Sequence, residues 1–566
     1  MSDDKIRLVL CWHMHQPNYF DTAKQEYILP WTYLHIIKDY VDMAAHLEEC
    51  EGAAAVVNFV PILLEQIDDY SQQITDWSEN RNVIRDPLLA ALGVDSVKEF
   101  IAARDYPLVQ SCLRANEERL IDRFPNYKKL VGLAKFCTEN PEYVSYLDEQ
   151  FLCDLLVWYN IAWMAETVKR DNQLIKQLIA KGSNFTREDR FALLSLIGDL
   201  SSTIIARYKR LAESGRVELS FTPYTHPIIP LLLDFDNARQ AVPDMPLPKT
   251  GDFPGGEERV RWQFEEGLKV FESHFGFRPI GCWPSEGGVS DDMLGACEQA
   301  GVKWLATGES VLRNSLHNAD MSQYDCIHHS YHVKDSAINL YFRDDGLSDQ
   351  IGFNYSSWHA DDAVNNLIHH IENIAAACPD KNNAVVSIIL DGENAWEYYP
   401  ENGYYFLSAL YEKLASHSQI QLTTFSQCNE LVKEVRELPS LTAGSWVHGT
   451  FSTWMGDAEK NHGWDLLCEA KHVYDRVMAD GKLNAEEREL ATKQLAVCEG
   501  SDWFWWFGDY NPGDSVKDFD DLYRKHLQRL YELLHEPIPD VLYTVISAGG
   551  GDPAAGGVMR QGSENS

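Results

Sequence analysis

The stretch VVSIILDGENAWEYYPENG at residues 385–403 joins an apolar run to a cluster of carboxylates. The run at 385–390 is short and rich in β-branched residues, which predicts a buried strand. Asp391 follows it directly, and Glu393 and Glu397 lie slightly further on. Because active sites of parallel α/β sheets and barrels lie at the carboxyl ends of strands, Asp391 is the first candidate for a catalytic acid. A polar loop that only meets solvent is the alternative explanation.

Similar apolar runs alternate with helical patterns over some 425 residues, as parallel α/β architecture requires. The other predicted strands lie at 6–11, 56–60, 216–223, 276–283, 302–307, 338–343 and 420–425. The stretch from about 61 to 214 is helical in pattern, with few strand candidates. We therefore predict an α/β barrel at 1–425 with a helical insertion at about 61–214. Periodicity alone does not separate a barrel from an open sheet.

The last part of the chain has a different character. Residues 426–545 are largely helical in pattern and include the tryptophan-rich segment GSDWFWWFG at 500–508. We predict that they form a helical C-terminal domain. The low-complexity sequence that follows predicts a disordered tail at 546–566.

Composition narrows the class of ligand. The 566 residues contain 49 Lys and Arg against 86 Asp and Glu, a formal net charge of −37. Such a surface repels phosphate backbones and anionic lipid headgroups, so we expect neither nucleic acid nor a membrane as partner. Aromatic residues make up 11%, which suits the packing of sugar rings on aromatic side chains but also suits a large core.

The cysteines and the N-terminal segment indicate a reducing compartment. Twelve cysteines are scattered without a CxxC pair, which is typical of reduced core thiols. The apolar run at 8–12 is too short for a secretion signal, and no run of ~18 apolar residues is present. We expect a cytoplasmic protein without a membrane-spanning helix.

A second carboxylate stands in a place comparable to that of Asp391. Glu286, in GCWPSEGG at 281–288, follows the strand predicted to end at Trp283. Pro284 and two glycines make a sharp loop that would present this side chain to a cavity. Glycosidic bonds are hydrolysed by two carboxyl groups that flank the bond, so the pair predicts such chemistry. A solvent-facing loop glutamate is the alternative.

Histidines follow two further strands. HMHQP at 13–17 places His13 and His15 on one face, and GRVELSFTPYTHPIIP at 215–230 places Glu218 inside a strand and His226 beyond it. A buried strand glutamate needs a partner, so Glu218 is either a hydrogen-bonded core residue or a site residue. These groups would suit zinc, but His13, His15 and His226 do not have HxxxH or HExxH spacing, and neutral histidine binds sugar equally well. We expect no metal and no cofactor.

Taken in order, these segments resemble glycoside hydrolase family 57, the amylase and amylopullulanase-like α-glucan enzymes. Five segments resemble the five motifs of that family, in the same order. They are HMHQP, GRVELSFTPYTHPIIP, GCWPSEGG, ILDGENAWEYY and, at 451–467, FSTWMGDAEKNHGWDLL. The similarity also takes in LPWTYLHIIKDY at 29–40, FPGGEERVRWQFE at 253–265 and SDWFWWFGD at 501–509, and so spans roughly 6–540.

The resemblance implies a fold and a set of roles. The fold is an incomplete seven-stranded α/β barrel, followed by a helical region that completes the cleft. Glu286 is implied as the nucleophile and Asp391 as the general acid/base of a retaining mechanism, with Glu393 in support. The remaining candidates for substrate binding are His13, His15, Glu218, His226, Trp283, Trp396, Trp454, Asp457 and Trp464.

We therefore predict an α-glucan-active glycoside hydrolase that cleaves α-1,4 bonds in maltooligosaccharides, starch or glycogen, with α-1,6 cleavage and oligomeric state left open. A 4-α-glucanotransferase using the same residues is the first alternative. A metal-dependent deacetylase or mannosidase and a non-catalytic glucan-binding protein are the others. WPSEGGVS at 283–290 resembles the amylopullulanase-like branch more than the branching enzymes.

Overall fold

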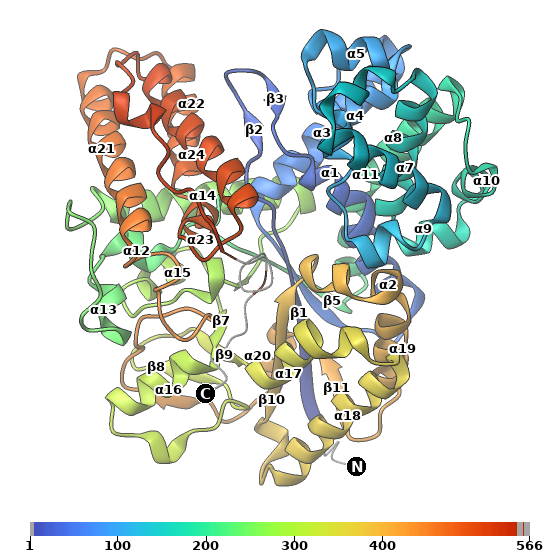
Figure 1. The fold of residues 1–566 in the computed structure, drawn as a ribbon. Helices are drawn as coiled ribbons and strands as arrows, with labels where there is room; N and C mark the ends of the chain where they lie inside the picture. Colours follow the sequence, from blue (N-terminus) through green and yellow to red (C-terminus); the bar gives the residue numbers. More distant parts are fainter. Residues whose placement is uncertain (1–4, 552–558, 560–566) are drawn as a thin grey trace.

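The computed structural model describes residues 5–551 and Met559. Its centre is a ring of seven parallel strands, which lies below two helical regions in Figure 1. The order is β10-β1-β4-β5-β6-β7-β9, and a pairing of Ser387 with Arg343 between β10 and β9 closes the ring. The strands are β1 (Ile6–Met14), β4 (Ala55–Phe59), β5 (Val217–Phe221), β6 (Gly281–Cys282), β7 (Trp304–Gly308), β9 (Asn339–Arg343) and β10 (Val385–Asp391). This confirms the predicted seven-stranded barrel.

Side chains along the strands alternate between the inside and the outside of the barrel. In β1, Val9 and Cys11 belong to a small inner cluster, whereas Leu8 and Leu10 belong to the large outer one. His13, at the carboxyl end of β1, is two residues beyond Cys11 and therefore also points to the inside of the barrel. His13 lies opposite Asp391 in the register of β1 with β10, so the ends of two neighbouring strands bring them to one level.

A short helix, α20 (Phe425–Leu431), closes the opposite end of the barrel. Its Phe425 and Cys428 belong to the inner cluster together with Trp304 and Val385, the first residues of β7 and β10. The amino-terminal end of the barrel interior is therefore filled by apolar side chains.

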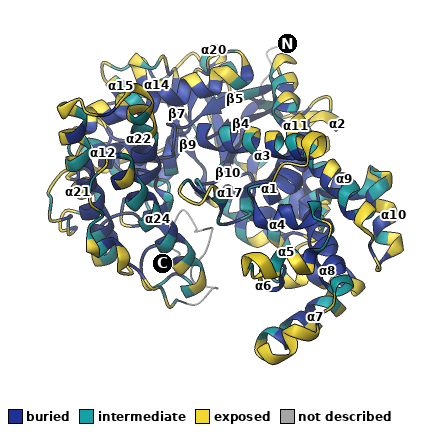
Figure 2. Ribbon diagram, turned by 90° about the horizontal axis from the view of Figure 1, so that it is seen from above, coloured by how far each residue is buried: buried dark blue, intermediate teal, exposed yellow. Residues whose placement is uncertain are grey.

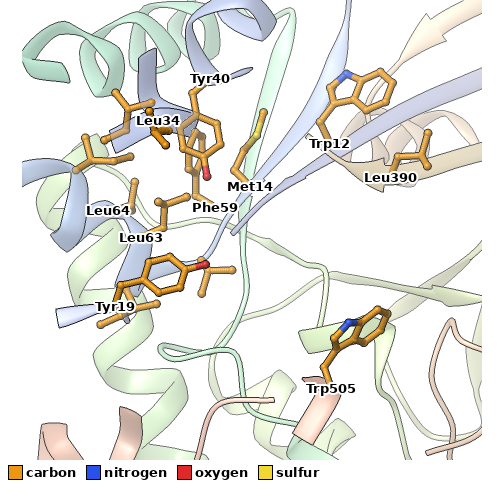
Figure 3. Close-up of a cluster of buried hydrophobic side chains, with 14 of the residues drawn as sticks. Trp12, Met14, Tyr19, Leu34, Tyr40, Phe59, Leu63, Leu64, Leu390 and Trp505 are labelled. Atoms are coloured by element: carbon orange, nitrogen blue, oxygen red, sulfur yellow. The ribbon is translucent and has the colours of Figure 1, made fainter. Parts of the chain in front are cut away.

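Helices cover the outside of the barrel and bury the apolar outer faces of the strands (Figure 2). They include α2 (Val41–Glu49), α14 (Gly256–Phe275), α16 (Glu309–Asn318), α18 (Ala360–Ala377) and α19 (Tyr404–Ala415). Figure 3 shows Trp12, Leu390 and Phe59 from three strands in one cluster with Leu34 and Leu63 from the helices. Full burial of such a side chain contributes roughly 1.5–3 kcal/mol, so this layer stabilises the barrel.

The predicted insertion consists of helices only, since no strand lies between β4 and β5. The main ones are α3 (Pro61–Asn80), α5 (Val97–Arg104), α6 (Leu108–Ser111), α7 (Pro125–Glu139), α8 (Glu149–Trp163), α10 (Gln173–Lys181) and α11 (Arg187–Glu213). By length and composition alone α11 could cross a membrane, but core helices pass the same test and α11 packs along α3.

The C-terminal helices are α21 (Ala458–Asp480), α22 (Ala485–Cys498), α23 (Asp502–Trp506) and α24 (Gly513–Leu533). They begin later than the predicted boundary at 426, because α20 and β12 (Arg436–Leu438) still belong to the barrel region. β8 (Tyr331–Val333), β12 and the β2–β3 hairpin (Phe20–Asp21 and Glu26–Tyr27) were not predicted, since two or three residues carry no periodicity.

The start of the predicted tail is held in place. Asp520 Oδ1 accepts hydrogen bonds of 2.8 and 3.0 Å from the backbone nitrogens of Ile546 and Ser547. Residues 546–551 and Met559 are described, whereas the rest of the predicted disordered tail lies outside the described residues.

Candidate active site

A cavity of about 480 Å³ opens at the carboxyl ends of the barrel strands. The barrel supplies its floor, and helices from the two helical regions supply its walls. The floor residues are His13, His15, His226, Trp283, Glu286, Arg343, Asp391, Glu393 and Trp446. The wall residues include Trp31, His35 and Arg114 on one side and Asp502, Trp505, Trp506, Asp514, Asp518 and Phe519 on the other.

Asp391 is the last residue of β10 and its carboxyl group reaches the cavity. Burial raises the pKa of this carboxyl above its ordinary value of 3.8, while the hydrogen bond from Asn394 Nδ2 to Oδ2 (2.9 Å) and the nearby His15 and Arg343 oppose the rise. A carboxyl with a raised pKa keeps its proton to a higher pH, as a general acid must.

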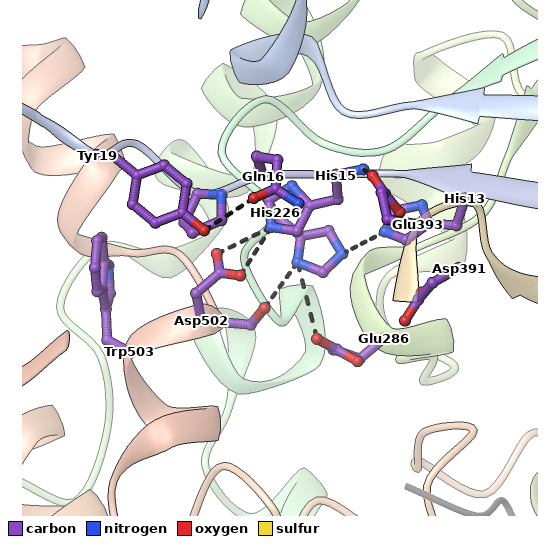
Figure 4. Close-up of polar contacts among 12 residues, drawn as sticks. His13, His15, Gln16, Tyr19, His226, Glu286, Asp391, Glu393, Asp502 and Trp503 are labelled. Carbon is purple, nitrogen blue, oxygen red and sulfur yellow. Dashed lines mark hydrogen bonds and ion pairs between the residues drawn. The ribbon is translucent and has the colours of Figure 1, made fainter. Parts of the chain in front are cut away.

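Glu286 lies in a tight turn, Ser285–Gly287, just after β6. Its backbone has φ of 57°, which is strained for a residue with a side chain, and strain of this kind concentrates at functional sites. Gly287 also has positive φ, and a Cβ there would lie 2.9 Å from the ring of Trp283. Trp446 Nε1 donates to Glu286 Oε2 at 3.1 Å. Figure 4 shows the carboxyl groups of Glu286 and Asp391 pointing towards the same space.

His13 and His226 meet beside this space, with their Nε2 atoms 3.2 Å apart. Asn58 Nδ2 donates to Ser220 Oγ, so Asn58 Oδ1 is left to accept from His13 Nδ1–H at 2.7 Å. Burial lowers the pKa of His13 to about 3 and that of His226 well below its usual range, with repulsion from His15 next in both. Both rings are therefore neutral near pH 7.

Glu393 and Asp502 hold His15 from two sides. Glu393 Oε1 accepts from the backbone nitrogen of His15 (2.9 Å) and from the Tyr40 hydroxyl (2.6 Å), and His15 Nε2 lies 2.9 Å from Asp502 Oδ1. Burial, and next the charge of Asp391, raise the pKa of Glu393 well above its ordinary value. Figure 4 shows Asp502 reaching His15 from the C-terminal helices.

One group of side chains has the spacing that a metal ion needs. Among the described residues, His15, His226 and Asp502 each place a ligand atom within 4.8 Å of the others. Neutral imidazoles and a carboxylate suit zinc. However, His15 Nε2 is paired with Asp502, and both ring nitrogens of His226 are engaged, Nδ1 with Ser501 Oγ at 2.8 Å and Nε2 with His13 Nε2 at 3.2 Å.

Seven of the twelve predicted site residues line the cavity. They are His13, His15, His226, Trp283, Glu286, Asp391 and Glu393. The five others lie elsewhere, and each is held by the protein. Glu218 points into the lower barrel, where its Oε1 accepts from Trp304 Nε1 at 2.7 Å and its Oε2 from the backbone nitrogen of Ser426 at 2.9 Å.

The four remaining residues have structural contacts instead of cavity contacts. Trp396 packs edge-on against Trp12 with ring centroids 5.8 Å apart, and Trp464 stacks on Phe504 at 4.2 Å. Trp454 is fully buried, 5.9 Å from Trp505 and so behind a ring that does line the cavity. Asp457 caps α21 by accepting from the backbone nitrogen of Glu459 at 2.8 Å.

Several cavity residues were not singled out from the sequence. Trp505, Trp506 and Asp502 lie in the tryptophan-rich segment, whose composition and resemblance to the family were the available signals. Arg343 ends β9, donates from Nε to the Ile389 carbonyl (2.8 Å) and lies 4.9 Å over the ring of Trp446. Arg343 ends a predicted strand, and this position could have identified it as a candidate for the site. Trp446 lies in a loop, where the sequence offers no such signal.

Comparisons with solved structures show the same fold in carbohydrate enzymes. A family 57 branching enzyme from Pyrococcus horikoshii is 16% identical and superposes with a TM-score of 0.58, over 97% of this chain and 98% of that one. A family 57 branching enzyme from Thermococcus kodakaraensis is 15% identical and superposes with a TM-score of 0.57, over 94% of this chain and 90% of that one. The α-amylase AmyC from Thermotoga maritima is 15% identical and superposes with a TM-score of 0.56, over 94% of this chain and 93% of that one. No curated protein matches this chain.

The family itself is shown by the sequence. The family model described as glycosyl hydrolase family 57 matches residues 9–439. That range contains four of the five segments on which the resemblance was based, together with Glu286 and Asp391. As predicted from those segments, the chain belongs to glycosyl hydrolase family 57.

Proposed function

We propose that this enzyme cleaves α-1,4-glucosidic bonds of α-glucans with retention of configuration. The observation that carries the proposal is the meeting of Glu286 and Asp391 in one cavity at the carboxyl ends of the barrel strands. Two carboxyl groups facing one space are what glycosidic hydrolysis requires. Trp283, Trp446 and Trp505 add aromatic surface on which sugar rings pack.

In the first step Asp391 donates its proton to the glycosidic oxygen as Glu286 attacks the anomeric carbon. The bond between that carbon and the leaving oxygen breaks, and an ester to Glu286 forms. Burial favours the protonated form of Asp391, and the Trp446 indole orients the Glu286 carboxylate. Retention requires the two carboxyl groups to act about 5–5.5 Å apart.

In the second step Asp391 has lost its proton and acts as a base. It takes a proton from water or from a sugar hydroxyl, whose oxygen attacks the anomeric carbon and releases Glu286. The neutral rings of His13 and His226 line the cavity beside the two acids, where Asn58, Ser501 and the contact between the two rings hold them in place.

Water as the acceptor makes the enzyme a hydrolase, and a sugar hydroxyl makes it a glucanotransferase. The likeness of WPSEGGVS to the amylopullulanase-like branch favours hydrolysis, with α-1,6 bonds as further candidates. The solved relatives include both an amylase and branching enzymes. All twelve cysteines are free, which supports the further proposal of a cytoplasmic enzyme.

A product time course on maltoheptaose tests the proposal. We expect reducing ends to rise in step with the appearance of shorter oligosaccharides. Longer chains formed without a rise in reducing ends would replace the hydrolase with a transferase. Unchanged maltoheptaose after long incubation, at any enzyme concentration, would overturn both.

A further inference from the structure

The segment LPWTYLHIIKDY at 29–40 supplies no reacting group, yet it forms part of the cavity wall. α1 (Trp31–His35) continues into η1 (Ile36–Tyr40), a single turn of π-helix. Such turns are rare and occur frequently at functional sites. Trp31 and His35 line the cavity, and Tyr40 donates to Glu393 at 2.6 Å.

Three charged or ionisable side chains are buried together in this segment. Asp39 is fully buried, and His35 and Lys38 are 6% and 1% exposed. Asp39 Oδ2 lies 2.6 Å from His35 Nδ1, and Asp39 Oδ1 accepts from Lys38 Nζ at 2.8 Å. Removing such groups from water costs several kcal/mol each, and apolar residues of similar size are often at least as stabilising. The group therefore calls for an explanation other than stability.

The hydrogen bonds define what His35 offers to the cavity. The carboxylate of Asp39 accepts, so Nδ1 of His35 carries the hydrogen and Nε2 is the ring nitrogen available to a ligand. The ring is also fixed by packing, since it stands edge-on to the buried Trp163 at 5.9 Å and 90°. Trp31 lies 5.8 Å from the same Trp163, so an indole and an oriented imidazole stand side by side on the wall.

We propose that His35, oriented by Asp39, binds a second glucosyl unit of the glucan through its Nε2, next to the ring of Trp31. The inference rests on the proposed function, and adds a sugar position on the helical wall to the one at the barrel floor. A sugar hydroxyl forms a hydrogen bond with Nε2, and the apolar face of the sugar ring packs on an indole. Asp39 is a positioning residue, since it acts through His35.

Binding as a function of chain length tests this position. Calorimetry with maltotriose to maltoheptaose would be done on Asp391→Asn protein, which binds without turnover. We expect His35→Ala to raise Kd for the longer oligosaccharides about 3- to 10-fold, the value of one hydrogen bond, and to leave the shortest unchanged. Asp39→Asn should show the same dependence on length more weakly, because the ring is retained but no longer oriented.

Three further variants separate this role from a structural one. His274→Ala removes another histidine that is paired with an aspartate, Asp68, but that lies outside the cavity lining, and should leave every Kd unchanged. Tyr40→Phe removes the donor to Glu393 from the same turn and should lower kcat without altering the dependence on chain length. His35→Gln keeps a polar group of similar reach and should restore part of the affinity.

The outcomes distinguish this inference from the proposed function. If the Asp391→Asn protein bound no maltooligosaccharide at all, the proposed function would fail. If it bound them and His35→Ala weakened all lengths equally or none, the second sugar position would be refuted while the proposed function stood.

Discussion

Glu218 and Asp391 both point into the barrel, from β5 and β10, and burial raises the pKa of each, yet their surroundings differ. Both oxygens of Glu218 accept hydrogen bonds within the protein, from Trp304 and Ser426, at the end closed by α20. Asp391 accepts one hydrogen bond, from Asn394, and faces the cavity at the open end. An acid whose oxygens are all engaged holds the fold together, whereas one left partly free can exchange a proton with a ligand.

The largest effect should come from removing the acids at the open end. Glu286→Ala and Asp391→Ala should each lower kcat/KM on maltoheptaose by about 1,000-fold or more, because each deletes a reacting group. Glu218→Gln should stay within about threefold of wild type when assayed below its unfolding temperature. A Glu218 variant as inactive as the other two would erase the distinction between the two ends.

The acid at the closed end should matter for stability instead. In Glu218→Gln the new amide nitrogen faces either the backbone nitrogen of Ser426 or the donors on the other oxygen. An unsatisfied buried group of this kind costs about 1–3 kcal/mol, which lowers the midpoint of thermal unfolding. Asp391→Asn should lower the midpoint less, and calorimetric scans of the two variants at one scan rate compare them.

The strand-end argument located several residues of the candidate site, because the barrel brings the carboxyl ends of its strands together. His13, Glu286 and Asp391 were located in this way. The sequence placed Glu218 within a strand but did not give its level in the barrel, since inward-pointing positions at both ends of a strand have the same parity. Asp502 and Trp505 come from a helix more than a hundred residues beyond the last barrel strand, and no local pattern points a helix at a cleft.

The fifth segment shows a second limit of sequence reasoning. Trp454 and Trp464 belong to it, but the structure buries them, with Trp464 Nε1 donating to the Trp454 carbonyl at 3.0 Å. Segments shared within a family include residues that support a site without touching it. A sequence without a structure does not separate these residues from those that line the cavity.

The single hydrogen bond to Asp391 gives a smaller, pH-dependent prediction. The first step needs protonated Asp391, so activity falls as pH rises through its pKa. Asn394 lowers that pKa by stabilising the charged form, and Asn394→Ala should therefore move the alkaline limb of kcat to higher pH by up to about one unit. Asn140→Ala, on a partly exposed residue after α7 and outside the cavity lining, should leave the profile in place. A shift to lower pH would contradict this assignment of the acid.

The smallest effect should come from chelation. If His15, His226 and Asp502 hold no metal, dialysis against EDTA should leave kcat/KM on maltoheptaose unchanged. A loss of activity that zinc restores would mean that the open end works through a metal ion, as a deacetylase or mannosidase would.

The most direct test of the central claim is to trap the intermediate on Glu286. An activated α-maltosyl fluoride needs no acid to leave, so it should react with Asp391→Asn protein, in which no base remains to release the sugar. Intact-mass and peptide mass spectrometry should then find one maltosyl unit attached at Glu286. An adduct on another residue, or turnover of the fluoride by Glu286→Ala protein at an undiminished rate, would contradict the account.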